Sequence, residues 1–175
     1  WTLIMNLSAV FVIFLISIPL GIYLAGKKDK RVDRSISLIL FAVYSLPVFW
    51  VATLLLVFFT TAEYGQWMDL FPGPGLGELR SSAPFWDRLM ERSSHLILPI
   101  FCLSFGGIAF VTRQLRGSMI ETLDQDYIRT ARAKGLGEGL VLWKHAFRNA
   151  LFPLISLVVL MVPSLLAGSI IVEYI

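Results

Sequence analysis

The sequence predicts an all-α, polytopic membrane protein with about four transmembrane helices. It is 57% hydrophobic and only 15% charged, with a mean hydropathy of +0.75, which is too apolar for an ordinary soluble domain. Charged residues are absent from four long stretches, namely residues 1–26, 35–62, 93–112 and 149–172. Each stretch reaches the roughly 20 residues that an α-helix needs to cross about 30 Å of hydrocarbon. We therefore expect four spans joined by polar connections.

The charged residues between these stretches predict the orientation of the chain. Of the fifteen Lys and Arg residues, five lie in 27–34, three in 80–92 and seven in 113–148. Cytoplasmic loops are enriched in Lys and Arg, so the first and third connections are predicted to lie inside and residues 61–92 outside. Membrane topology also accounts for the net charge of +3. We do not expect nucleic acid as a partner, because no pattern of stacking aromatic residues accompanies the basic ones.

The first span, residues 1–26, is followed by a short basic turn, and the second span carries polar residues near its middle. Pro47 lacks a backbone N–H and is expected to bend this second helix. Tyr44, Ser45 and Trp50 would place polar atoms at a depth where lipid offers no hydrogen bonds. They would either line a pathway or pack against another span, and we predict all four residues as pathway candidates.

The predicted outer loop, residues 61–92, contains the run Phe-Pro-Gly-Pro-Gly-Leu-Gly, which favours turns. A short amphipathic helix is expected near 85–92, before the third span. Ser104, Gly106 and Gly107 lie in the middle of that span and either line a pathway or permit close helix packing. His95 has no second His, Cys or acidic residue at ligand spacing, so no metal site is predicted.

The third connection, residues 113–148, contains a predicted short helix that supplies its own stop signals. Asp124 and Asp126 are good N-cap residues, and Gly135 can adopt the left-handed conformation that ends a helix. Acidic residues precede basic ones along this segment, which complements the helix dipole.

Small residues follow in the same helix and leave room for the backbone of another protein: Ala131, Ala133 and Gly135. The pattern is therefore typical of a docking helix. A second amphipathic helix is expected over 138–149, leading into the last span.

This segment resembles a family signature. Residues 129–135, with Pro153 downstream, stand where binding-protein-dependent ABC transporter permeases carry their cytoplasmic Glu-Ala-Ala-x-x-x-Gly signature. Ala131 and Gly135 match that broad signature, whereas Arg129 and Thr130 replace its Glu and first Ala. The full run Tyr-Ile-Arg-Thr-Ala-Arg-Ala-Lys-Gly, followed by Leu-Trp-Lys-His-Ala-Phe-Arg-Asn-Ala, is similar to the dipeptide, oligopeptide and nickel branch.

The resemblance implies a single transmembrane (permease) domain over 1–175, truncated at both ends, in the inner (cytoplasmic) membrane. Implied partners are a second homologous permease subunit, two ATP-binding subunits and an extracytoplasmic substrate-binding protein that contacts the outer loop. ATP and Mg²⁺ are expected in the partner ATPase, with no cofactor on this chain and no enzymatic activity of its own. The resemblance assigns one helix to coupling with the ATPase: Tyr127, Ile128, Arg129, Thr130, Ala131, Arg132, Ala133, Lys134 and Gly135.

Peptides are the expected substrate, and a nickel or modified-peptide importer is the alternative. An ion-coupled secondary transporter ranks behind both, because such transporters need ionisable groups near the membrane midplane and none of the four uncharged stretches supplies an acidic or basic residue there. A membrane enzyme or a purely structural subunit is a further alternative. No carboxylate pair, Ser-His-Asp set or metal cluster is discernible in the sequence to support an enzyme.

Overall fold

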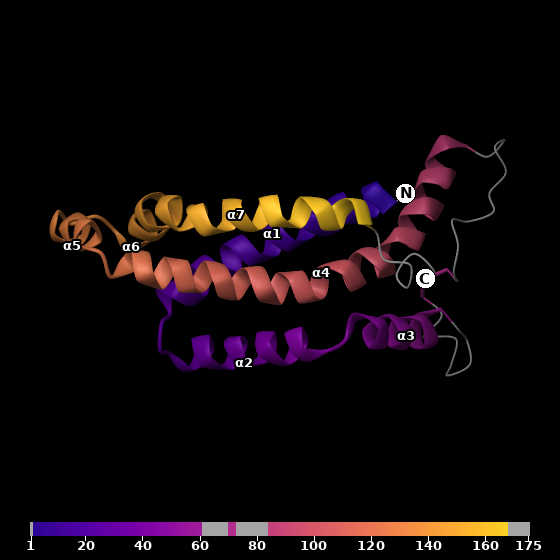
Figure 1. Ribbon diagram of the computed structural model, residues 1–175, viewed down its shortest axis with the longest axis horizontal. Coiled ribbons are helices and arrows are strands. Elements are labelled where there is room, and N and C mark those ends of the chain that lie inside the picture. The colour runs from indigo at the N-terminus through magenta and orange to yellow at the C-terminus, as the bar shows by residue number, and fades with distance from the viewer. Residues whose placement is uncertain (1, 61–69, 73–83, 168–175) are drawn as a thin grey trace.

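The computed structural model describes residues 2–60, 70–72 and 84–167, and every regular element in these ranges is a helix. The predicted all-α class is therefore confirmed. Three long helices lie side by side and form most of the molecule (Figure 1): α1 (Thr2–Gly26), α4 (Phe85–Leu123) and α7 (Phe147–Ala167).

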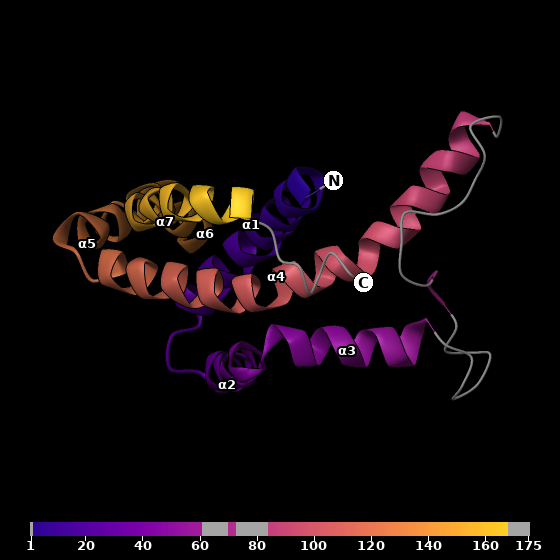
Figure 2. The ribbon, with the colours of Figure 1, turned by 45° about the vertical axis from the view of Figure 1, so that its right-hand side comes forward.

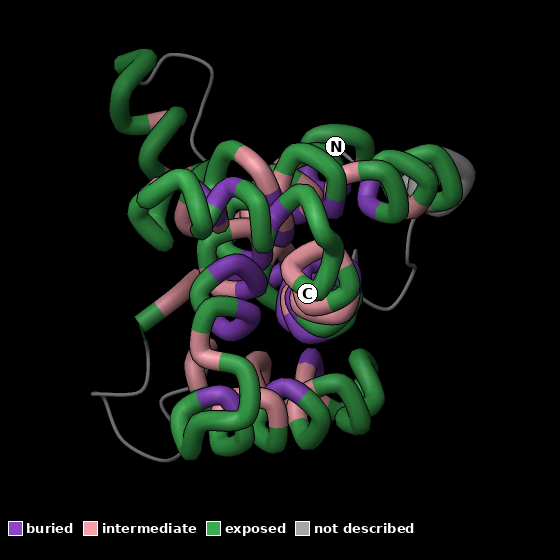
Figure 3. Tube along the Cα trace, turned by 90° about the vertical axis from the view of Figure 1, so that its left-hand side faces the viewer, coloured by how far each residue is buried: buried purple, intermediate pink, exposed green. Residues whose placement is uncertain are grey.

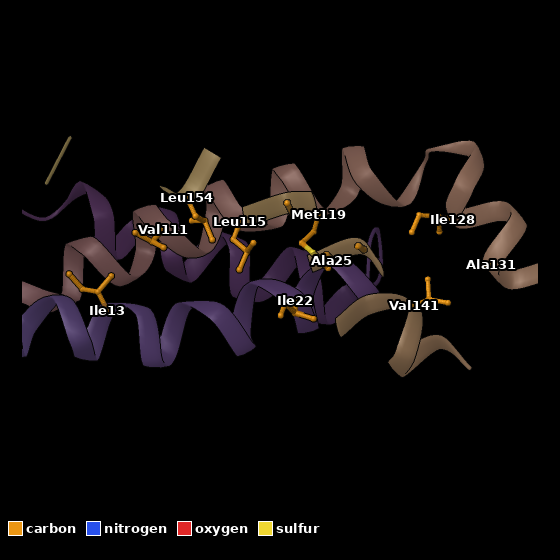
Figure 4. Packing of buried hydrophobic residues seen from close by; sticks show 12 residues of the cluster. Ile13, Ile22, Ala25, Val111, Leu115, Met119, Ile128, Ala131, Val141 and Leu154 are labelled. Atoms are coloured by element: carbon orange, nitrogen blue, oxygen red, sulfur yellow. The ribbon is translucent and has the colours of Figure 1, made fainter. Parts of the chain in front are cut away.

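The main hydrophobic core lies where these three helices meet. Ile13 and Ile22 of α1 pack in one cluster with Val111 and Leu115 of α4 and with Leu154 of α7 (Figure 4). Buried residues concentrate on the facing sides of the helices, whereas the outward sides are exposed (Figure 3). Large apolar side chains on those outward sides are expected of helices whose surroundings are lipid or other subunits rather than water.

The second predicted span is divided into two helices, α2 (Arg31–Ser45) and α3 (Val48–Phe59), bent by 90° relative to each other. The view in Figure 2 looks nearly along α2, whereas α3 crosses it. Leu46 and Pro47 between them are both extended, with ψ of 128° and 133°. The bend predicted at Pro47 is confirmed, and two restrictions favour a break in the helix at this position. Proline donates no hydrogen bond, and its ring excludes the helical conformation from the residue before it.

Residues 85–92 do not form a separate short helix but the first turns of α4, which continues through the third predicted span for 39 residues. The sequence contains no Gly or Pro between Phe85 and Pro99 that would end a helix earlier. Pro99 itself lies inside α4, where a proline removes one backbone hydrogen bond without necessarily ending a membrane helix.

The third connection contains α5 (Asp126–Ala133), a single turn α6 (Glu138–Leu140) and a π-helical segment η3 (Val141–Ala146) that runs directly into α7. The helix expected from residue 138 is therefore present, although its π-helical geometry was not predicted. The N-caps assigned to Asp124 and Asp126 are wrong. Gln125 occupies the N-cap of α5, whereas Asp124 ends α4 and its carboxylate pairs with Lys28 at 3.2 Å.

The described residues contain two helices long and apolar enough to cross a membrane, over Leu3–Gly26 and Phe85–Leu123. They contain three if α2 and α3 together count as one broken span. The fourth predicted span, residues 149–172, corresponds to α7 but extends past Ala167, the last described residue. That span therefore stays a prediction, as does the outer loop, most of which lies outside the described residues.

Candidate functional site

The helix α5 lies at one end of the molecule, beyond the ends of α4 and α7 (Figure 1). One side of it is buried against the rest of the chain: Ile128 is 0% exposed and Ala131 is 7% exposed. The other side is open to the surroundings and consists of Asp126, Tyr127, Arg129, Thr130, Arg132 and Ala133. The helix therefore has one anchored face and one free, mostly polar face.

The anchored face joins α5 to the core of the bundle. Ile128 and Ala131 belong to the same hydrophobic cluster as Met119 of α4, Ala25 of α1 and Val141 of η3. Ile128 and Val141 face each other in Figure 4. Because this cluster is continuous, displacement of α5 as a body would be resisted by contacts that reach three other elements.

Ala131 was predicted to leave room for the backbone of another protein, but its methyl group lies against this chain instead. The sequence signal was correct in one respect, since a small residue is required where α5 packs closely. The small residues that remain on the exposed side are Ala133 and Gly135.

The end of α5 has the geometry that the sequence predicted for Gly135. This glycine has φ of +79°, and its N–H donates to the carbonyl of Arg132 at 2.9 Å. The N–H of Leu136 donates to the carbonyl of Ala131 at 3.3 Å, which completes a Schellman motif. Leu136 also packs against the core cluster, so the turn after α5 is fixed by both hydrogen bonds and apolar contact.

Polar contacts tie α5 to the elements that follow it. Arg132 pairs with Glu138 through Nε–Oε1 at 2.8 Å and Nη2–Oε2 at 3.3 Å. Asn149 of α7 donates from Nδ2 to the Tyr127 hydroxyl oxygen at 2.6 Å. The remaining pair, Arg129 with Asp126 at 3.3 Å, is highly exposed and contributes little to stability.

A second polar connection, absent from the sequence-based predictions, fixes the basic turn before α2. Arg116 of α4 holds Asp33 in a bidentate pair, with Nε–Oδ1 and Nη2–Oδ2 both at 2.6 Å. The Asp33 side chain is only 2% exposed and also accepts a hydrogen bond from the Asp29 N–H at 3.1 Å. Together with the pair between Lys28 and Asp124, these contacts join the turn to α4 and to the C-terminal end of that helix. Sequence reasoning assigned the charges of this turn to topology alone, because nothing in the sequence links positions 33 and 116.

The pathway candidates lie in two different environments, one around the bend at Pro47 and one in the middle of α4. On α2 and α3, Tyr44, Ser45, Pro47 and Trp50 are all exposed. The Tyr44 ring stacks on Phe110 of α4 with centroids 6.0 Å apart, and the Ser45 hydroxyl donates back to the Phe41 carbonyl at 2.9 Å.

The candidates of α4 lie elsewhere, within the helix bundle. Ser104 is buried, and its hydroxyl donates to the Phe101 carbonyl at 3.2 Å. A Cβ on Gly107 would collide with the Ile13 side chain of α1, whereas a Cβ on Gly106 would meet nothing within 4 Å. These contacts favour close helix packing at Ser104 and Gly107. A pathway role for the seven residues stays a prediction.

Long apolar helices, a basic turn and a short helix with one exposed face at one end of the bundle together define a polytopic α-helical membrane protein. The family comparison agrees with this class. Residues 17–175 match the model of the family described as binding-protein-dependent transport system inner membrane component, and the chain belongs to that family. Members of this family are membrane subunits of transporter complexes, which is consistent with a chain that is not itself an enzyme.

Named relatives point to the same family. The chain is 40% identical over 174 residues to the oligopeptide transport system permease protein AppB of Bacillus subtilis, covering 99% of this chain and 52% of that protein. It is 37% identical to the inner membrane ABC transporter permease protein YejB of Escherichia coli O157:H7, covering 87% and 41%. It is 32% identical to the dipeptide transport system permease protein DppB of Escherichia coli K12, covering 98% and 54%. The chain thus spans about half the length of these relatives.

Proposed function

We propose that this chain forms part of one of two transmembrane subunits of an ATP-driven importer that carries dipeptides or oligopeptides across the inner membrane. The single observation that supports a coupling role is that α5 has one buried and one exposed face. Ile128 is fully buried in the bundle, whereas Arg129, Thr130 and Ala133 are exposed. The peptide substrate is supported by the names of two relatives, an oligopeptide and a dipeptide transport system permease protein.

In this proposal the exposed face of residues 127–135 docks in a cleft of a separate ATP-binding subunit. Nucleotide changes the membrane pathway only if the docked helix makes different contacts in the two states of the ATPase. Movement of α5 would then pass to α1, α4 and α7, because the core cluster around Ile128 and Met119 joins them. A rigid-body transition of this kind needs a stiff connection between the moving site and the spans.

The partners proposed here are a second homologous permease subunit, two ATP-binding subunits and an extracytoplasmic substrate-binding protein. ATP and Mg²⁺ would bind to the ATP-binding subunits and not to this chain. An importer of nickel or modified peptides uses the same coupling arrangement and differs in the binding protein. An ion-coupled secondary transporter remains the less favoured alternative, because it gives α5 no partner.

The test uses the full-length subunit, assembled with its ATP-binding subunits, second permease and binding protein in lipid vesicles. The variant is Ala133→Trp, which adds bulk on the exposed face of α5 while leaving Ile128 and Gly135 unchanged. The matched control is Leu160→Trp, which adds bulk at a position of α7 that is 73% exposed. The readout is ATP hydrolysis stimulated by binding protein together with a peptide.

We expect Ala133→Trp to abolish the stimulation and to weaken retention of the ATP-binding subunits, with Leu160→Trp close to the unmodified complex. Full stimulation of an inserted Ala133→Trp complex would contradict the docking role of α5. Stimulation by nickel but not by peptides would contradict the peptide assignment and leave the coupling role intact.

A further inference from the structure

A pocket of about 450 Å³ lies between α2 and α4, on the side of α4 away from the main core. Its lining comes from two helices that are distant in sequence: Ser37, Phe41 and Tyr44 of α2, and Phe110, Arg113, Gln114 and Arg116 of α4. The lining combines three aromatic rings with two guanidinium groups and contains no acidic residue.

The charge of this pocket is set by Arg113. Arg116 is already neutralised by its bidentate pair with Asp33. Arg113 forms no ion pair within the part of the chain that the structure describes, and its guanidinium carbon lies 5.4 Å from the centre of the Phe41 ring. An arginine over an aromatic face keeps its N–H groups available at the edge of its plane for an anion.

The position of the pocket along the chain places it near one membrane surface. Arg113 directly follows the uncharged stretch 93–112, and Asp33 and Arg116 lie just outside the uncharged stretches of their helices. The Lys and Arg distribution predicts this surface to be the cytoplasmic one. The aromatic residues Phe41, Tyr44 and Phe110 extend from it toward the middle of their uncharged stretches. The pocket is therefore cationic at the predicted interface and apolar beneath it.

We propose that this pocket binds an anionic phospholipid of the inner leaflet, with its phosphate group at Arg113 and its upper acyl chain along Phe41, Tyr44 and Phe110. Gln114 also lines the pocket and supplies a further amide donor beside Arg113. The charge order of a phospholipid, anionic outside and apolar inside, matches that of the pocket. Basic pockets between membrane helices on the cytoplasmic side suit such head groups. This inference depends on the membrane location of the chain and is independent of the transported substrate.

The experiment uses the full-length permease in its assembled complex, reconstituted in phosphatidylcholine vesicles that contain a small fraction of photoactivatable phosphatidylglycerol. After illumination, the labelled peptides are mapped and quantified. The variant Arg113→Gln removes the proposed phosphate partner. The matched control is Arg34→Gln, which removes one positive charge from an exposed position in the first turn of α2 and does not line the pocket.

Label is expected on the lining segments of α2 and α4, and Arg113→Gln should reduce it about tenfold, the effect of losing a hydrogen bond to a charged group. Arg34→Gln should leave the amount of label within about twofold of that in the unmodified complex, because it changes only the long-range attraction between the protein surface and anionic lipid. Unlabelled phosphatidylglycerol should compete, whereas extra phosphatidylcholine and a large excess of inorganic phosphate should not.

Three results would overturn the proposal. Equal loss in the two variants would mean that only surface charge attracts the lipid. Competition by inorganic phosphate would identify a free-anion site, and competition by a transported peptide would assign the pocket to the substrate pathway. A retained ATPase stimulation in Arg113→Gln shows that the variant is folded and assembled, so that a loss of label cannot be attributed to misfolding.

Discussion

Replacement of Ile128 by alanine should release α5 from the bundle without altering its exposed face. Ile128 is 0% exposed and packs in the cluster that contains Met119 and Val141. Truncation of a buried isoleucine to alanine costs about 2–5 kcal/mol. If that cost falls on the local opening of α5, even the lower value corresponds to a roughly 30-fold larger open population, because about 1.4 kcal/mol is a factor of ten.

The assay is hydrogen exchange with mass spectrometry on the full-length permease in lipid nanodiscs, following the amides of α5 relative to those in the middle of α4. Exchange in α5 should accelerate roughly 30-fold or more in Ile128→Ala. The conservative control Ile128→Val costs only about 0.5–1.5 kcal/mol and should accelerate it by a few-fold to about tenfold. Unchanged exchange in Ile128→Ala would refute the argument that this side chain anchors α5. Equal acceleration throughout α4 would show global destabilisation instead of local release.

Three further predictions concern stability, measured as thermal unfolding of the permease in detergent. Arg116→Gln should lower the free energy of unfolding by about 3 kcal/mol, because it leaves the Asp33 carboxylate buried and without an ion-pair partner. The double variant with Asp33→Asn should lose less stability than the sum of the two single variants. Strictly additive losses would argue against a stabilising contact between the two side chains. Gly107→Ala should cost about 1–3 kcal/mol by forcing a methyl group against Ile13, whereas Gly106→Ala should be tolerated, and the prediction fails if the two variants are equally stable. Thr112→Val should be neutral or stabilising, because the buried Thr112 hydroxyl has no hydrogen-bond partner among the described residues. Ser17→Ala should lower the free energy of unfolding by about 1 kcal/mol, because it removes the hydroxyl that donates to the Ile108 carbonyl at 3.1 Å. A large loss of stability in Thr112→Val would reveal a partner for that hydroxyl.

Local signals in the sequence predicted the elements that depend on local chemistry. Long uncharged stretches predicted the long helices, Pro47 predicted the bend, and Gly135 predicted the left-handed end of α5. Each of these features follows from the conformational limits of one residue or from a run of apolar residues. The size of the bend at Pro47 was not predictable in the same way, because it also depends on how α2 and α3 pack on α4.

Features that depend on contacts between residues distant in sequence could not be predicted from the sequence. The pair between Asp33 and Arg116 joins positions 83 residues apart. In the sequence, each of them alone is typical of a charged residue at the membrane surface. Ala131 illustrates the same limit. Its small size correctly indicated a close contact, but only the packing decides whether the partner is another protein or, as observed, the chain itself. The N-cap of α5 was misassigned because Asp124 is engaged by Lys28 from a different loop.

The two faces of α5 bear on the proposed coupling role, because this helix carries Arg and Thr where the broad family signature has Glu and Ala. Arg129 and Thr130 both lie on the exposed face, and neither contributes to the buried contacts made by Ile128 and Ala131. Changes at the exposed positions can therefore adjust the fit to a particular ATP-binding subunit while the anchor stays the same. The residues that match the signature, Ala131 and Gly135, are those that pack the helix and end it. In the proposed coupling role, the matching positions would preserve the transmission of movement and the departures would select the ATP-binding subunit.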